Sequence, residues 1–292
     1  MSKSFFDHGK FPCLITDIEN GPYHAGPGIS KSILDLFAQY TPARAKWIWD
    51  HPEEKATSPA FTLGTAVHAI VLESSTFLER YIESPTFAGT GSVKAKADFL
   101  ASCAEHGITP LAPEVWKKTH AMREAVRRSD DACALLESGF AEVSGYWIDK
   151  DTGALCRCRP DFLTDGEYEN AAGIRARVVV DLKTAQHAGM SEFAKASARF
   201  RYHVSDAFYS KGMAAIHDGL YFHYWFLVVE TEPPHGVAIY ELDQDSKRLG
   251  AVIAKHDLAL IKQCMVNDDW PAYPKGARVI SLPKWAEFTN II

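Results

Sequence analysis

The spacing of apolar side chains changes along the chain and divides it into predicted elements. In the first half they recur every three to four positions, which is typical of amphipathic helices. We predict helices over residues 31–39, 43–49, 62–72 and 113–136. Ser30 and Thr62 stand where N-caps of two of these helices are expected. Residues 1–27 combine Gly-Pro signals with little period and predict an irregular arm.

From residue 141 the period changes to two, which indicates strands. Val143–Ile148 and Ala154–Phe162 flank a polar turn and predict a hairpin, and a polar loop over 164–173 leads to a third strand at Arg177–Thr184. A helix over 191–216, strands over 221–229 and 236–242, and a helix over 246–265 complete the pattern. This order predicts an α/β fold with a mixed sheet flanked by helices.

The length of 292 residues and the hydrophobic content of 47% suit one compact domain. Within it we distinguish an arm (1–27), a mainly helical part (28–140), a core (141–245) and a C-terminal helix with a tail (246–292).

The balance of 31 basic and 37 acidic residues gives a net charge of −6 and no sign of a polyanion partner, so any DNA-binding track must be local. The six cysteines show no disulfide or Cys-x-x-Cys spacing and predict reduced, intracellular thiols. Without a signal peptide or a membrane-spanning run, we expect a soluble, cytoplasmic protein.

The strand at Arg177–Thr184 ends in the charged sequence Asp181-Leu182-Lys183. Alternation along a strand places Asp181 and Lys183 on one face and Leu182 on the other. A carboxylate at the end of a buried strand is compensated either by an ion pair with the lysine or by a bound cation. This sequence alone leaves both readings open.

A second acid follows Arg159-Pro160 at Asp161. Together, Pro160-Asp161 and the downstream Asp181-Leu182-Lys183 resemble the PD-(D/E)XK metal-dependent nucleases of the RecB-like group, and within it the RecE-type exonucleases and their phage relatives. Further motifs occur in the family's order at 28–32, 63–68 and 202–209.

The resemblance implies an αβββαβ core and a divalent metal site. Asp161, Asp181, the Leu182 carbonyl and His68 would hold the metal, and Lys183 would orient the attacking water. Magnesium prefers such oxygen ligands, and manganese can substitute for it. From chemistry alone, a lone histidine in an apolar helix, such as His68, is more often a hydrogen-bonded core residue than a ligand. An iron–sulfur cluster is not expected, because only one cysteine follows Lys183.

The family also has a Gln-x-x-x-Tyr motif for DNA. Here Tyr209 fits, but Ser205 replaces the glutamine. Lys195, Arg199 and Arg201 lie nearby in sequence and are further candidates for phosphate contacts.

The resemblance implies an exonuclease that degrades linear duplex DNA from the 5′ end and leaves a 3′ tail for recombination by annealing. It also implies a ring-shaped homo-oligomer and a single-strand annealing protein as a partner, with no role for a membrane. An endonuclease or flap nuclease of the same superfamily and a catalytically decayed DNA-binding module are the alternatives.

Overall fold

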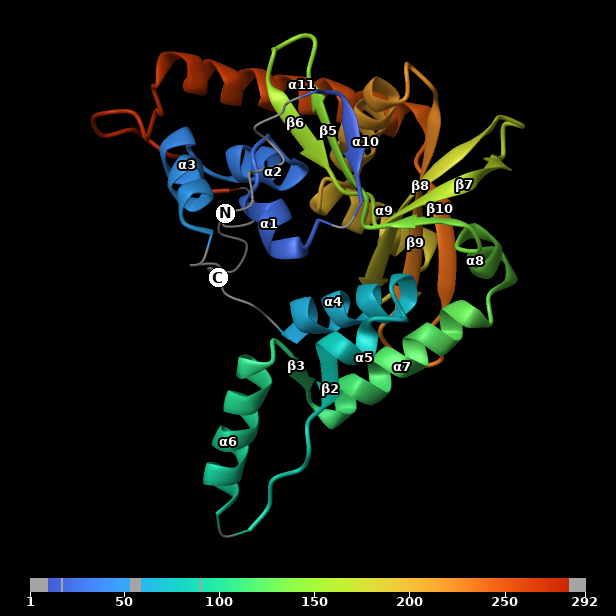
Figure 1. The fold of residues 1–292 in the computed structure, drawn as a ribbon. Helices are drawn as coiled ribbons and strands as arrows, with labels where there is room; N and C mark the ends of the chain where they lie inside the picture. The colour runs from blue at the N-terminus through green and yellow to red at the C-terminus, as the bar shows by residue number, and fades with distance from the viewer. Residues whose placement is uncertain (1–9, 17, 53–58, 90, 284–292) are drawn as a thin grey trace, which may run out of the picture.

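A five-stranded mixed sheet forms the centre of the computed structural model, which describes residues 10–16, 18–52, 59–89 and 91–283. The strand order is β10 (Val237–Glu241), β9 (Phe222–Glu230), β8 (Arg175–Ala185), β7 (Phe162–Glu169) and β4 (Gly139–Ala141). β8 and β9 are parallel, and the other neighbours are antiparallel. The predicted mixed α/β architecture is confirmed (Figure 1).

Helices cover both faces of this sheet. One face carries α2 (Lys31–Gln39), α9 (Met190–Arg199), α10 (Tyr202–Ile216) and α11 (Gln244–Asn267), and the other carries α4 (Pro59–Leu72), α7 (Pro113–Arg127) and α8 (Asp130–Leu135). Val179 packs into the first layer, whereas Val178, Val180 and Leu182 pack into the second. The predicted alternation along β8 is therefore confirmed.

The N-terminal segment is more ordered than predicted. It contributes β1 (Cys13–Ile15) to a second sheet with β5 (Ser144–Ile148) and β6 (Leu155–Cys158), followed by α1 (Asn20–Ala25). Arg157 on β6 donates hydrogen bonds to the carbonyls of Tyr23 and His24 at 2.7 and 3.0 Å. These bonds hold the segment against the sheet, so the expectation of an irregular arm was wrong for these described residues, while residues 1–9 lie outside them.

The predicted strand over 154–162 is split. β6 ends at Cys158 and β7 begins at Phe162 in the other sheet. Pro160 explains the break, because proline has no N–H to continue a ladder. The predicted loop over 164–173 is in fact largely β7, whose polar outer half pairs with β8.

Two long predicted helices are also split. Ser129 accepts a hydrogen bond from the Ala132 N–H and begins α8 as a separate helix after α7. Arg201, with φ of 57°, separates α9 from α10. α4 begins at Pro59, upstream of the cap predicted at Thr62, and Ser30 occupies the N-cap of α2 without a capping hydrogen bond from its side chain. The predicted helix at 43–49 corresponds to α3 (Pro42–Asp50).

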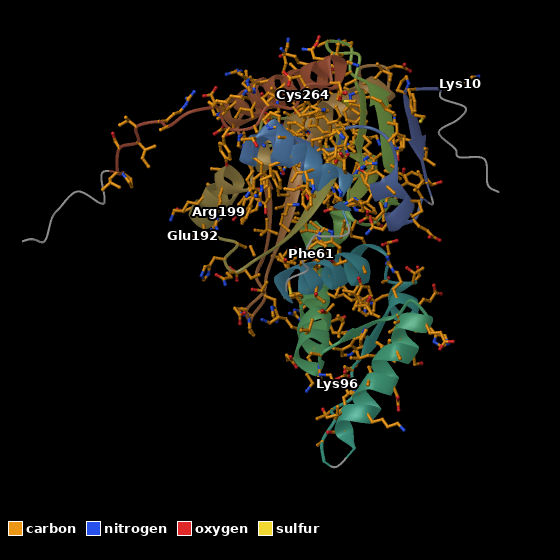
Figure 2. All side chains as sticks on the ribbon, turned by 90° about the vertical axis from the view of Figure 1, so that its left-hand side faces the viewer. Lys10, Phe61, Lys96, Glu192, Arg199 and Cys264 are labelled. Carbon is orange, nitrogen blue, oxygen red and sulfur yellow. The ribbon has the colours of Figure 1, made fainter. Side chains whose placement is uncertain are left out.

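Residues between α4 and α7 project from this body (Figures 1 and 2). They form α5 (Phe77–Arg80), β2 (Tyr81–Glu83), α6 (Ser92–Glu105) and β3 (Thr109–Leu111). Among the described helices, none has the length and apolar character needed to cross a membrane.

Candidate metal and catalytic site

Asp161 lies at the bend where the chain passes from one sheet to the other. Its Oδ2 accepts a hydrogen bond of 2.7 Å from the Leu182 N–H on β8. In an extended strand the carbonyl of a residue points to the same side as its amide, so the Leu182 carbonyl also faces the side of Asp161. The predicted metal contact of that carbonyl stays a prediction.

Asp181 and Lys183 lie side by side on the same face of β8, as alternation predicts. The Lys183 ammonium donates to Asp181 Oδ1. The Tyr224 hydroxyl on β9 donates to the other oxygen, Oδ2, at 2.9 Å. Asp181 is 7% exposed and lines a cavity, and these two hydrogen bonds hold its carboxylate in place.

His68 and Glu142 complete the site from two other elements. His68 on α4 places Nδ1 3.5 Å from Asp161 Oδ2. Glu142 follows β4, and its backbone N–H donates to the Asp161 carbonyl at 3.1 Å. One ligand atom each of His68, Glu142 and Asp161 lies within 4.8 Å of the other two, which marks them as a group able to hold a metal ion.

Glu142 was not predicted from the sequence. It lies between a short strand and the predicted hairpin, with no motif around it. Only the structure points to a role for Glu142, whose φ of 51° is a left-handed conformation that residues other than glycine adopt rarely.

The charged groups of the site shift one another's pKa values. Burial, and then the negative charge of Asp181, raise the pKa of Asp161 well above its usual value. Burial also disfavours the charged form of Asp181, but the Lys183 ammonium and the hydrogen bonds from Lys183 and Tyr224 outweigh it and hold the pKa of Asp181 below its usual range. The two aspartates likewise outweigh burial at Lys183 and raise its pKa, so that side chain is an ammonium ion at neutral pH.

Of the two other groups, His68 is neutral at neutral pH and Glu142 is only partly ionised. Burial and the charge of Lys183 lower the pKa of His68 to about 4, so the imidazole is free to act as a ligand at neutral pH. Burial raises the pKa of Glu142 to about 7.

The donor set fits a hard divalent cation. Magnesium binds oxygen ligands at about 2.0–2.1 Å, so ligand atoms on opposite sides of one ion lie about 4 Å apart. The ligand atoms of the group around Asp161 lie within 4.8 Å of one another, which is close to this spacing. A cation would also stabilise the charged form of Asp161 and Glu142, the two partly buried carboxyls whose pKa values are raised.

A cavity of about 360 Å³ opens beside these residues. Its wall includes Ser205 and Tyr209 from α10, in agreement with their predicted place near the site, and Lys31 from α2. The Lys31 ammonium is held by Asp35 at 2.7 Å. Tyr23 and His24 of the N-terminal segment line it too, so this segment forms part of the site.

The three basic residues predicted to contact phosphate have different surroundings. Lys195 and Arg199 are exposed on α9, where Figure 2 shows Arg199 at the surface. Arg201 instead donates to Asp35 at 3.1 Å and to Asp257, which ties α10 to α2 and α11. The structure therefore does not bring Arg201 to the cavity.

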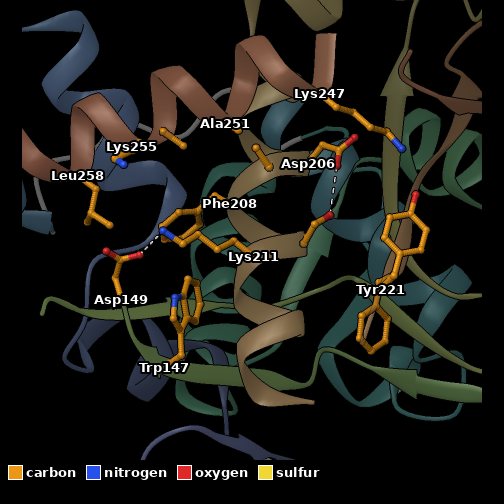
Figure 3. Close-up of a pocket in the computed structure, with 14 residues that line it drawn as sticks. Trp147, Asp149, Asp206, Phe208, Lys211, Tyr221, Lys247, Ala251, Lys255 and Leu258 are labelled. Carbon is orange, nitrogen blue, oxygen red and sulfur yellow. Dashed lines mark hydrogen bonds and ion pairs between the residues drawn. The ribbon is translucent and has the colours of Figure 1, made fainter. Parts of the chain in front are cut away.

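A second cavity of about 380 Å³ lies between α10, α11 and β5 (Figure 3). Trp147, Phe208 and Leu258 make it largely apolar, and Lys211 at its edge pairs with Asp149 at 2.5 Å. It contains none of the predicted site residues.

A sequence model of the PDDEXK-like domain of unknown function DUF3799 matches residues 30–282. The chain belongs to this family. The sequence resemblance assigns the signature to Asp161, Asp181 and Lys183, and these three residues line the same cavity. No curated protein matches the sequence.

Among solved structures, the fold of this chain is similar to that of a protein from Eubacterium rectale described as a "putative exonuclease". The TM-score is 0.57 at 13% identity, over 90% of this chain and 91% of the other. At this identity the likeness shows the fold alone. The PDDEXK-like domain and the geometry of its site together support a nuclease.

Proposed function

We propose that this protein is a magnesium-dependent deoxyribonuclease that degrades linear double-stranded DNA from its ends. The observation that carries the proposal is the convergence of Asp161, Asp181 and Lys183 on one cavity, although Asp161 lies in the bend before β7 and the other two lie on β8. A structural ion pair alone would account for Asp181 and Lys183, but not for the partly buried carboxyl of Asp161 beside them or for His68 and Glu142 around it.

Each residue has a definite task in phosphodiester hydrolysis. Asp161, His68 and Glu142, with Asp181 beside them, would hold the metal ion, which when bound supplies charge neutralisation and an activated water. Lys183, as an ammonium ion, would donate hydrogen bonds to a phosphate oxygen in the cavity and stabilise its negative charge. Its raised pKa favours this task over that of a general base.

The decisive experiment compares the wild type with Lys183→Ala on end-labelled linear duplex DNA, in magnesium and in EDTA. We expect the variant to lose about a hundredfold or more of the rate, because the transition state loses a cation. Lys255→Ala is the matched control, since this α11 side chain is 68% exposed and lines the second cavity instead. Equal nucleotide release by wild type and Lys183→Ala, or release that persists in EDTA, would refute the proposal.

The finer features rest on the family resemblance. We propose 5′-to-3′ digestion that leaves a 3′ tail, a homo-oligomeric ring and a single-strand annealing partner. Labels at the two ends of the same duplex report the polarity, and light scattering reports the oligomer as a multiple of the 32.4 kDa chain. A covalently closed circle should stay intact, and its cleavage would favour an endonuclease.

A further inference from the structure

The carboxylate of Asp181 is held from two sides by different strands. Lys183, on the same strand, donates to Oδ1, and Tyr224, on the parallel neighbour β9, donates to Oδ2 at 2.9 Å. The lysine is long and flexible and lies at the cavity wall. The tyrosine is rigid and only 1% exposed, so of the two donors it is the one that fixes the carboxylate in place.

The register of the sheet explains why Tyr224 reaches this carboxylate. Val179 lies opposite Tyr224, and Asp181 lies opposite Phe226, so Tyr224 is the diagonal neighbour of Asp181 on the same face. The tyrosine ring packs edge-on against Tyr209 and Phe226, at centroid distances of 5.9 and 5.2 Å. These contacts hold the hydroxyl at one position.

We propose that Tyr224 is a positioning residue for metal binding: its hydroxyl fixes the orientation of the Asp181 carboxylate toward the cavity. A carboxylate has about four lone-pair sites. Tyr224 and Lys183 each occupy one, which leaves the other sites for a cation in the cavity that Asp161 and Asp181 both line. Without the hydroxyl, Asp181 is free to rotate toward Lys183, and metal binding must restore the productive orientation. This inference rests on the proposed function.

Tyr224→Phe tests the inference because it removes only the hydroxyl and keeps the buried ring. We expect the concentration of magnesium at half-maximal activity to rise about tenfold, while the KM for DNA stays unchanged. The matched control is Tyr240→Phe on β10, whose hydroxyl donates to the Ala188 carbonyl at 2.5 Å, outside the site. This control should keep the metal dependence of the wild type.

Two further measurements separate the outcomes. Melting temperatures in EDTA confirm that both variants are folded at the assay temperature. Calorimetric titration with manganese measures the metal affinity without any need for activity. A wild type that binds manganese but cleaves no DNA refutes the proposed function, whereas weaker binding by Tyr224→Phe would still support the positioning role. Equal metal dependence and equal manganese affinity in wild type, Tyr224→Phe and Tyr240→Phe would overturn it.

Discussion

Glu142 is held in a backbone conformation that is unfavourable for its residue type. A left-handed residue other than glycine costs on the order of 1–3 kcal/mol, and such residues cluster at functional sites. Glu142 has a φ of 51°, its side chain belongs to the metal-binding group, and burial raises its pKa to about 7. Backbone and side chain thus both indicate that function, rather than stability, accounts for this residue.

The raised pKa of Glu142 makes a prediction about stability and pH in EDTA. Between its ordinary value of 4.5 and about 7, the folded protein keeps a proton on Glu142 that the unfolded chain has released. The contribution of this carboxyl to stability therefore falls as pH rises through that window. We expect Glu142→Gln to melt at a higher temperature than the wild type at pH 7.5, with a smaller difference at pH 5.

The lowered pKa of His68 has the opposite effect on the pH dependence of stability. Because it is present in both proteins, this effect cancels in the comparison. Thermal melts across this pH range, without added metal, give the measurement. If the melting temperatures of wild type and Glu142→Gln changed equally with pH, the Glu142 carboxyl would not be desolvated as described.

The residues of the site differed in how far the sequence could predict them. The sequence was enough to single out Asp161, Asp181 and Lys183, because these residues belong to short local motifs. Tyr224 lies in a predicted strand, but only the pairing with β8 shows that its hydroxyl meets Asp181. Glu142 depends on a turn conformation that has no local signal in the sequence.

At the scale of elements, Arg201 forms a joint between helices. It begins α10 in a left-handed conformation, and its guanidinium binds Asp35 on α2 and Asp257 on α11. Asp257 is 6% exposed, so it would be left as a buried charge without this partner. These contacts account for Arg201 without any DNA.

We therefore predict that Arg201→Ala lowers the free energy of unfolding by about 3 kcal/mol, the cost of removing one member of a buried ion pair. Affinity for DNA, measured on the folded protein, should change little. Urea denaturation and a DNA-binding titration check the two parts. Weaker DNA binding with unchanged stability would restore the phosphate contact expected from the sequence.

Arg199→Ala on the neighbouring helix α9 is the matched comparison, because this side chain is exposed. If Arg199 contacts phosphate, its loss should reduce the salt dependence of DNA binding by about one unit of slope without lowering stability. An unchanged slope would remove Arg199 from the DNA-binding surface.

The order of elements followed from periodicity, but their boundaries did not. Apolar residues recur at helical spacing over 191–216 and give no sign of the break at Arg201, because the break depends on ion pairs with residues distant in sequence. The change of sheet at Pro160 was similarly hidden, since a strand period cannot show which sheet a strand joins. Tertiary contacts decided both.

The whole molecule shows how an acidic chain can carry out chemistry on DNA. The cavity wall contains three basic residues, Lys31, Arg159 and Lys183, and four acidic ones, Asp35, Glu142, Asp161 and Asp181. Such a wall attracts a divalent cation before it attracts a phosphate. Binding of the metal and of the scissile phosphate are therefore expected to be coupled, in keeping with a net charge of −6.

The most direct test of the metal site is the anomalous diffraction of manganese in crystals soaked with that ion. We predict a peak about 2.2 Å from a carboxylate oxygen of Asp161, with His68, Glu142 or Asp181 among the other ligands. No peak at saturating manganese, or peaks only at sites away from Asp161, would contradict it.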